Sequence, residues 1–133
     1  MKQIFILRHA QKSILTGGIT KKGEEQCKEL AKILPTFGIG IASEKKRTQE
    51  TVLFLTNTEP IIDNKANLEH ESGNELITLI KETMKKLQQN QNAIIISHSP
   101  SMTAAYHLLT KETISFGPLE GFKVDDKMKI KKV

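Results

Sequence analysis

Cysteine and aromatic residues are scarce in this 133-residue sequence, which has one cysteine (Cys27), no tryptophan and one tyrosine. A single cysteine cannot form a disulfide within the chain, and by itself it cannot build a metal cluster. It suits a reducing compartment, and its place in a helical pattern makes it a candidate core residue. The sequence also lacks basic stretches interleaved with aromatic residues, which argues against a partner of the nucleic-acid class.

Long hydrophobic runs are absent as well. The apolar run in MKQIFILRHA is too short for a signal peptide, and no later run approaches the ~18 residues of a membrane helix. There is no Walker A loop, no HExxH motif and no cysteine cluster, so the sequence implies neither a metal nor another cofactor. We therefore expect a cytoplasmic protein with no membrane partner.

The charge is moderately basic, with a formal net charge of +5. One basic cluster is formed by the neighbouring residues Lys45, Lys46 and Arg47, and another lies between positions 127 and 132. A basic excess of this kind favours anionic ligands in general and does not single out nucleic acid.

Segments with the pattern of strands alternate with segments that have the pattern of helices. Buried strands are expected at 3–7, 38–43 and 93–97, and a shorter strand at 60–62. Helices are expected from an N-cap at Thr20 to Pro35, from a cap at Ser43 to about Leu55, from Asn74 to about Gln89, and from Pro100 onward.

This alternation predicts an α/β fold, a three-layer sandwich with a mostly parallel central sheet and helices on both of its faces. The C-terminal segments FKV and MKIKKV, separated by Asp125 and Asp126, predict an antiparallel hairpin at the edge of the sheet. No linker, internal repeat or low-complexity stretch interrupts the sequence. We therefore expect residues 1–133 to form a single domain.

Arginine and histidine follow three of the predicted strands. IFIL runs into Arg8 and His9, IGIA precedes a helix that carries Arg47, and AIIIS runs into His98. Ligands of open α/β sheets bind beyond the carboxyl ends of the strands, so we expect these two arginines and two histidines to converge on one pocket. Two guanidinium groups match a tetrahedral oxyanion such as phosphate, and a nearby imidazole can act as a nucleophile or carry a proton.

Four short motifs follow one another along the chain: LRHA at 7–10, ITKKGEEQCKELAKIL at 19–34, SEKKRTQET at 43–51 and ISHSPSM at 96–102. In this order they resemble the signature segments of the histidine phosphatase (phosphoglycerate mutase-like) superfamily. The first is similar to its Leu-Arg-His-Gly motif, and the third to its Ser-x-x-x-Arg-Thr-x-x-Thr pattern. The last resembles the segment around the second histidine of that family. The resemblance covers nearly the whole chain.

The resemblance implies a metal-independent phosphatase that works through a phosphohistidine intermediate. His9 would be the nucleophile, and water would hydrolyse its phosphorylated form. Arg8, Arg47 and His98 would bind the phosphate oxygens and stabilise the charge of the transition state. No cofactor is implied.

Two positions do not follow directly from the family pattern: residue 10 and the general acid. Ala10 stands where the family usually has glycine, which would be penalised if the backbone there required a positive φ. Many relatives carry a glutamate a few residues before a glycine as the general acid. In LEHESG at 68–73, Glu69 has the more family-like distance to Gly73, and Glu71 is the alternative.

The spacing of the motifs bears on the substrate. His98 follows Arg47 by 51 positions, with no room for the long insertions that form a substrate lid in the mutase branch. We therefore expect an open, shallow pocket, which resembles the compact SixA-like branch of phosphohistidine phosphatases. The favoured substrate is phosphohistidine on a protein. The alternatives are a phosphomonoesterase for small phosphorylated metabolites and a phosphate-binding module without turnover. The oligomeric state is not predicted.

Overall fold

The structure is a computed structural model that describes residues 1–67 and 72–133 of the chain. Its elements follow the order β1 (Gln3–Arg8), α1 (Lys21–Ala31), β2 (Ile39–Ala42), α2 (Lys46–Thr56), β3 (Ile61–Ile62), the 3₁₀ helix η1 (Asn64–Ala66), α3 (Asn74–Lys86), β4 (Asn92–Ser97), α4 (Ser99–Thr110), β5 (Gly121–Asp125) and β6 (Ile130–Lys132). None of the helices within these ranges is long and apolar enough to cross a membrane.

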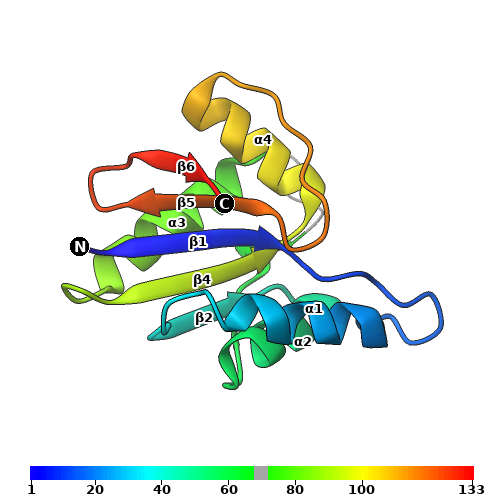
Figure 1. The fold of residues 1–133 in the computed structure, drawn as a ribbon. Helices are drawn as coiled ribbons and strands as arrows, with labels where there is room; N and C mark the ends of the chain where they lie inside the picture. Colours follow the sequence, from blue (N-terminus) through cyan, green and yellow to red (C-terminus); the bar gives the residue numbers. More distant parts are fainter. Residues whose placement is uncertain (68–71) are drawn as a thin grey trace.

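Within the described residues, six strands form one sheet in the order β3-β2-β4-β1-β5-β6 (Figure 1). Strands β3, β2, β4 and β1 are parallel, whereas β5 pairs antiparallel with β1 and β6 pairs antiparallel with β5. The predicted α/β architecture, with its antiparallel hairpin at the C-terminal edge, is therefore confirmed.

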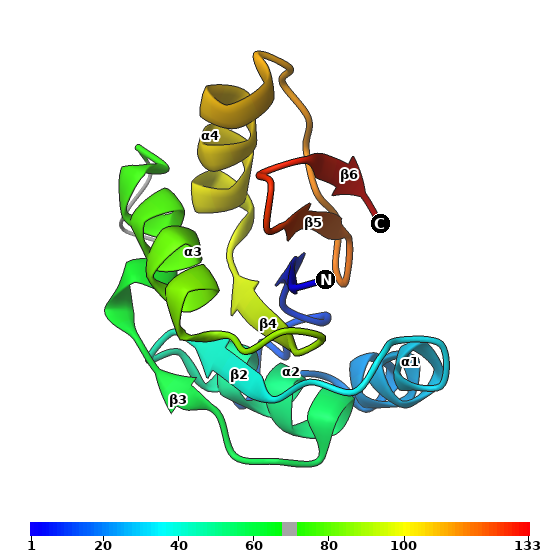
Figure 2. The same cartoon turned by 90° about the vertical axis from the view of Figure 1, so that its left-hand side faces the viewer.

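Helices cover both faces of the sheet, with α1 and α2 on one face and α3 and α4 on the other (Figure 2). The alternation of side chains along β1 divides the core accordingly. Ile4 and Ile6 pack in the cluster that includes α3 and α4, whereas Phe5 and Leu7 pack in the cluster that includes α1 and α2. Cys27 of α1 is fully buried in the second cluster, as its helical pattern predicts.

The register of the two central strands positions the residues that follow them. Strands β1 and β4 pair in parallel with Arg8 opposite Ser97. The next residues along the two strands are His9 and His98, so both histidines leave the sheet side by side at its carboxyl edge.

Two predicted helices end earlier in the structure than in the sequence pattern. Helix α1 starts after the predicted N-cap Thr20, whose side chain accepts a hydrogen bond from the Gly23 N–H, but it ends at Ala31 and not at Pro35. The chain tightens there through a bond from the Ile33 N–H to the Leu30 carbonyl. Helix α3 ends at Lys86 because Leu87 adopts an extended conformation and buries its side chain in the core.

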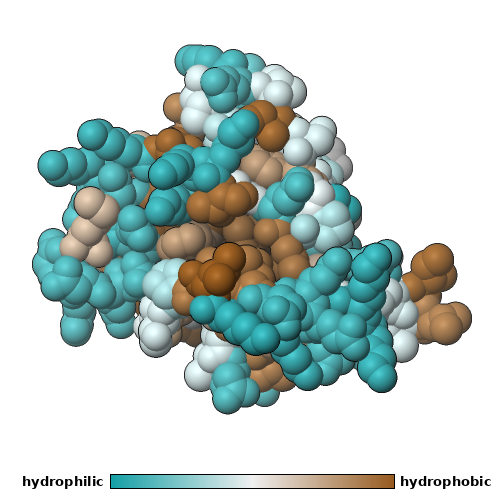
Figure 3. Space-filling view, in the orientation of Figure 1, coloured by the Kyte–Doolittle hydropathy of each residue, from teal (hydrophilic) through white to brown (hydrophobic). Residues whose placement is uncertain are grey.

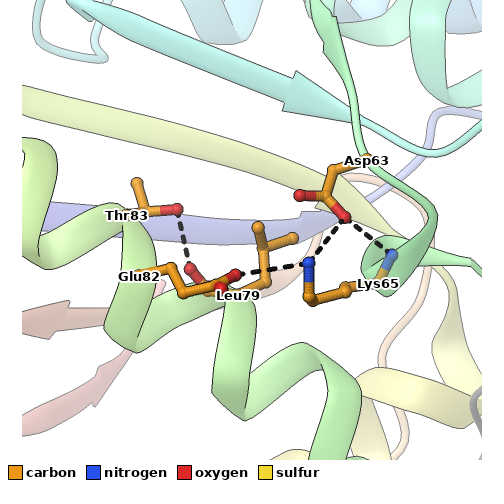
Figure 4. Close-up of polar contacts among 5 residues, drawn as sticks. All are labelled: Asp63, Lys65, Leu79, Glu82 and Thr83. Atoms are coloured by element: carbon orange, nitrogen blue, oxygen red, sulfur yellow. Dashed lines mark hydrogen bonds and ion pairs between the residues drawn. The ribbon is translucent and has the colours of Figure 1, made fainter.

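The short helix η1 is tied to α3 by an ion-pair cluster on the surface (Figure 4). The Lys65 Nζ lies 3.6 Å from a carboxylate oxygen of Asp63 and 3.4 Å from one of Glu82 on α3. Asp63 also accepts a hydrogen bond from the backbone N–H of Lys65 at 2.9 Å. These contacts fix the chain just after β3, where the Ala66 carbonyl accepts a hydrogen bond from Ser97 at the end of β4.

Candidate active site

A pocket of about 290 Å³ lies at the carboxyl edge of the sheet. Arg8, His9, Arg47 and His98 all line it, together with Lys12 and the first residues of α4. Residues that are far apart in the sequence are thus brought together, because β1, β4 and α2 all deliver side chains to the same edge. The N-terminus of α4 adds the partial positive charge of a helix end to this group of cations.

His9 is held in a single tautomer by the backbone carbonyl of the next residue. Its ring Nδ1 lies 2.7 Å from the carbonyl oxygen of Ala10, and a carbonyl can only accept, so Nδ1 carries the proton. The other nitrogen, Nε2, is then unprotonated in the neutral ring and accepts a hydrogen bond from the Arg47 Nε at 3.3 Å. The lone pair of His9 is therefore directed toward the guanidinium group.

His9 is neutral at physiological pH because of its surroundings. Burial lowers the pKa of His9 from 6.5 to about 4, against the opposing effect of the bond to the Ala10 carbonyl. The positive charges of Arg47, Arg8 and Lys12 contribute to the same decrease in the pKa of His9. A neutral imidazole with an unprotonated Nε2 is the form that can act as a nucleophile.

His98 lies next to His9, with the ring centroids 5.4 Å apart. The pKa of His98 is lowered to about 3, mainly by burial and in addition by the nearby His9, Arg47 and Lys45. Its Nε2 lies 3.0 Å from the hydroxyl oxygen of Ser43, which follows β2. Both histidines are thus neutral in the folded protein, although they stand among cations.

The guanidinium group of Arg8 has one nitrogen that is hydrogen-bonded to the backbone and one buried nitrogen without a partner among the described residues. Its Nη1 donates a hydrogen bond to the carbonyl of Phe116 at 2.9 Å, which anchors the guanidinium group to the loop after α4. In the described part of the chain, the Arg8 Nε and the His98 Nδ1 are buried without a hydrogen-bond partner. Buried polar atoms in this condition are uncommon, and they mark the pocket as a place with unused hydrogen-bonding capacity.

Hydroxyl side chains of the 43–51 motif form hydrogen bonds around the pocket. Ser43 is not the cap of α2 as predicted, since the helix begins at Lys46 with Lys45 at the N-cap position. The Ser43 hydroxyl instead contacts both His98 and Thr48, at 3.0 and 2.8 Å. The Ser43 hydroxyl is therefore engaged within the site. It also accepts a hydrogen bond from the Lys45 N–H, which is longer at 3.2 Å.

Thr51, the last residue of this motif, connects the two arginine-bearing segments. Its hydroxyl donates to the Arg47 carbonyl at 2.7 Å and accepts from the Ala10 N–H at 3.0 Å. The bond fixes the backbone directly after His9. The motif in the sequence contains these hydroxyls, but their partners could not be read from it.

Alanine is accommodated at position 10 without strain. Ala10 is fully buried and is not among the residues with positive φ. A Cβ added to Gly23 at the start of α1 would come within 3.3 Å of the Ala10 Cβ, so the methyl group faces this glycine. The concern that this position needs glycine for a left-handed backbone is therefore removed.

Two of the candidate residues cannot be placed. Glu69 and Glu71, the alternatives for the general acid, lie outside the described residues. In the described part of the chain, no carboxylate lines the pocket, and no three side chains of His, Cys, Asp or Glu are grouped as metal ligands. Lys12 also lines the pocket, and no prediction from the sequence includes it. The signal that the sequence offers for it is a cation three positions after His9.

The fold is the one found in histidine phosphatases, as the sequence resemblance predicts. A mycobacterial glucosyl-3-phosphoglycerate phosphatase in complex with VO3 is similar with a TM-score of 0.77 and 12% identity, covering 100% of this chain and 98% of that one. The phosphoserine phosphatase of Entamoeba histolytica, solved as a mutant with phosphoserine, gives 0.73 and 13%, over 100% and 95% of the two chains.

A third similar structure is Bacillus stearothermophilus YhfR, with a TM-score of 0.75 and 10% identity over 100% of this chain and 96% of that chain. No model of a protein family matches the sequence, and no curated protein does. At identities this low, the likeness establishes the shared fold.

Proposed function

We propose that this protein is a metal-independent phosphatase of the histidine phosphatase superfamily that transfers a phosphoryl group to His9 and then to water. The observation that carries the proposal is the state of His9. Its Nδ1 proton is bound to the Ala10 carbonyl, and its Nε2 lone pair is directed into a pocket with two arginines. The shared fold with known phosphatases supports the same assignment.

The reaction has two displacement steps. In the first, the Nε2 of His9 attacks phosphorus, an N–P bond forms, and the bond from phosphorus to the leaving group breaks. In the second, water attacks the phosphohistidine, the N–P bond breaks, and phosphate leaves while the lone pair returns to Nε2. The positive charges of Arg8 and Arg47 stabilise the transferring phosphoryl group in both steps.

His98 is proposed to bind a phosphate oxygen. When the hydroxyl of Ser43 donates to its Nε2, the proton of the neutral ring lies on Nδ1, the atom that has no protein partner in the described residues. The Arg8 Nε has the same unused capacity. A phosphate oxygen is a suitable acceptor for such donors.

The favoured substrate is phosphohistidine on a protein. The pocket is open to the surface, so a phosphorylated side chain of a protein can enter it. An alkoxide leaving group needs a proton from a general acid. An imidazole that leaves from an N–P bond can be protonated beforehand and needs less help. The short spacing between Arg47 and His98 supports the same SixA-like assignment.

Relative rates on two substrates test this choice. We expect the protein to dephosphorylate a phosphohistidine-bearing phosphotransfer domain with a kcat/KM well above that for p-nitrophenyl phosphate. Higher activity on small esters would instead favour the alternative of a metabolite phosphomonoesterase. Tight binding of phosphate or vanadate without turnover of any substrate would indicate a binding module.

The phosphomonoesterase alternative has a specific requirement, which is a general acid. The glucosyl-3-phosphoglycerate and phosphoserine phosphatases of the same fold are named for small esters, which keeps this alternative open. If Glu69 is the acid, Glu69→Gln lowers the rate on p-nitrophenyl phosphate by about 100-fold or more, and Glu71→Gln serves as the matched control. Equal rates for both variants and the wild type would exclude either carboxylate from this role.

A further inference from the structure

The turn between β1 and α1 presents two aliphatic side chains to solvent beside the pocket. Ile14 and Leu15 are 97% and 95% exposed, more than any of the other large hydrophobic side chains of the described residues. Figure 3 shows hydrophobic atoms projecting from the molecule where this turn lies in Figure 1. The two side chains are adjacent in the chain and form one exposed apolar patch, which is the kind of surface that proteins use for contacts.

The turn is held in shape by its own hydrogen bonds. Lys12 and Ile19 form an antiparallel bridge, and the Ser13 N–H donates to the Gly18 carbonyl at 2.7 Å. Gly17 supplies the positive φ of 76° that the turn requires. Ile14 and Leu15 therefore lie on a turn with a defined backbone conformation. Because such a turn is already ordered, it loses little conformational entropy when a partner binds.

The same turn is connected to the catalytic elements on both sides. The Ile19 N–H donates to the Glu50 carboxylate of α2 at 2.8 Å, and the Thr20 N–H donates to the Gln11 carbonyl at 2.8 Å. Gln11 and Lys12, where the turn begins, line the phosphate pocket. A protein whose phosphorylated side chain enters the pocket would therefore extend over the turn.

We propose that Ile14 and Leu15 form a docking contact for the protein that carries the phosphohistidine, and that they bind apolar side chains flanking it. This inference rests on the proposed function, because it names the surface through which the same site selects a protein over a small ester. Neither Ile14 nor Leu15 lines the pocket, so binding of a small phosphate ester there does not depend on them.

The test is the double variant Ile14→Ser/Leu15→Ser, assayed on a phosphohistidine-bearing phosphotransfer domain, on free phosphohistidine and on p-nitrophenyl phosphate. We expect kcat/KM on the phosphoprotein to fall about tenfold or more, mainly through KM, as for the loss of apolar anchors from an interface. Rates on the two small substrates stay unchanged. Ile33→Ser, which replaces another exposed isoleucine just past the far end of α1, is the matched control and leaves all three rates unchanged.

The possible failures can be told apart. Unchanged turnover of the phosphoprotein by the double variant, or an equal loss on all three substrates, would overturn the docking contact while the proposed function stands. Absence of turnover by the wild type on every substrate would overturn both. If sedimentation shows that the wild type is a dimer and the double variant a monomer, the two side chains bind a second copy of the chain, and the inference is wrong.

Discussion

At the scale of single residues, the protonation of His9 is the feature on which the proposed reaction depends. The Ala10 carbonyl selects the tautomer, and burial together with the neighbouring cations selects the neutral form. Neither effect needs a dedicated carboxylate partner. The hydrogen bond to the adjacent peptide, the burial of the ring and the neighbouring cations together keep Nε2 unprotonated.

This account predicts the titration of His9 in the protein without substrate. We expect ¹⁵N NMR to show a neutral ring protonated at Nδ1 down to about pH 4, where the charged form appears. The exposed His107 on α4 lies outside the pocket, and the variant His107→Ala identifies its signals. A pKa of His9 near 6.5, or a proton on Nε2, would contradict the assigned geometry.

Position 10 carries a second prediction at this scale. Because the backbone of Ala10 is not left-handed and its methyl group is fully buried, Ala10→Gly only adds freedom to the unfolded chain and removes packing. We expect the free energy of unfolding to fall by about 0.5–1 kcal/mol, with turnover retained. A gain in stability, measured by urea unfolding, would mean that the site prefers glycine after all.

At the scale of elements, helix α2 positions residues of the site through contacts with two strands. Its first turn carries Arg47, and the hydroxyls of Thr48 and Thr51 connect it to the ends of β2 and β1. The helix therefore sets the distance between the guanidinium group and His9. Its side chains face the sheet edge because the helix begins directly after β2.

Replacing Thr51 tests this connection. Thr51→Val leaves the buried N–H of Ala10 without a partner, which costs about 1–3 kcal/mol and loosens the backbone after His9. Thr51→Ser keeps the hydroxyl and is the matched control. We expect urea unfolding to show a larger loss for valine, and turnover to fall with it. Wild-type stability of Thr51→Val, or a larger loss for serine than for valine, would contradict the role of the hydrogen bond.

The elements themselves could largely be predicted from the sequence. The apolar strands at 3–7 and 93–97 and the cap at Thr20 were recognisable because local propensity and burial agree there. Errors arose where a tertiary contact prevailed over the local signal. Ser43 has the chemistry of a helix cap, but its hydroxyl is bonded to His98, a residue 55 positions away that no local pattern reveals.

At the scale of the whole molecule, the strand order explains why the pocket exists. Parallel pairing of β1 with β4 and of β4 with β2 brings three strand ends to one edge, and the general rule for α/β sheets predicts that edge from the sequence. The tautomer of His9, the unsatisfied nitrogens and the exposed turn at Ile14 and Leu15 could not be predicted. They depend on distances and exposure that only the folded chain defines.

Burying two neutral histidines also affects the stability of the whole fold. In the folded state the pKa is about 4 for His9 and about 3 for His98, below the ordinary value of 6.5. As the pH falls from about 6.5 to about 4, the unfolded chain binds protons on these rings that the folded chain does not. The free energy of unfolding therefore decreases over this interval.

Urea unfolding at several pH values between 7 and 4 measures this effect. The double variant His9→Asn/His98→Asn lacks both titrating rings, so we expect its stability to fall less steeply with decreasing pH than that of the wild type. Parallel curves for the two proteins would show that other groups cause the loss of stability in acid.

The central claim is that the phosphoryl group passes through His9, and trapping the phosphoenzyme tests it most directly. The protein is mixed with a phosphohistidine-bearing phosphotransfer domain or p-nitrophenyl phosphate, quenched in alkali and analysed by mass spectrometry. We predict acid-labile phosphate on the peptide that contains His9, retained in His107→Ala and lost together with turnover in His9→Ala. Undiminished turnover by His9→Ala, or phosphate on another residue, would contradict the account.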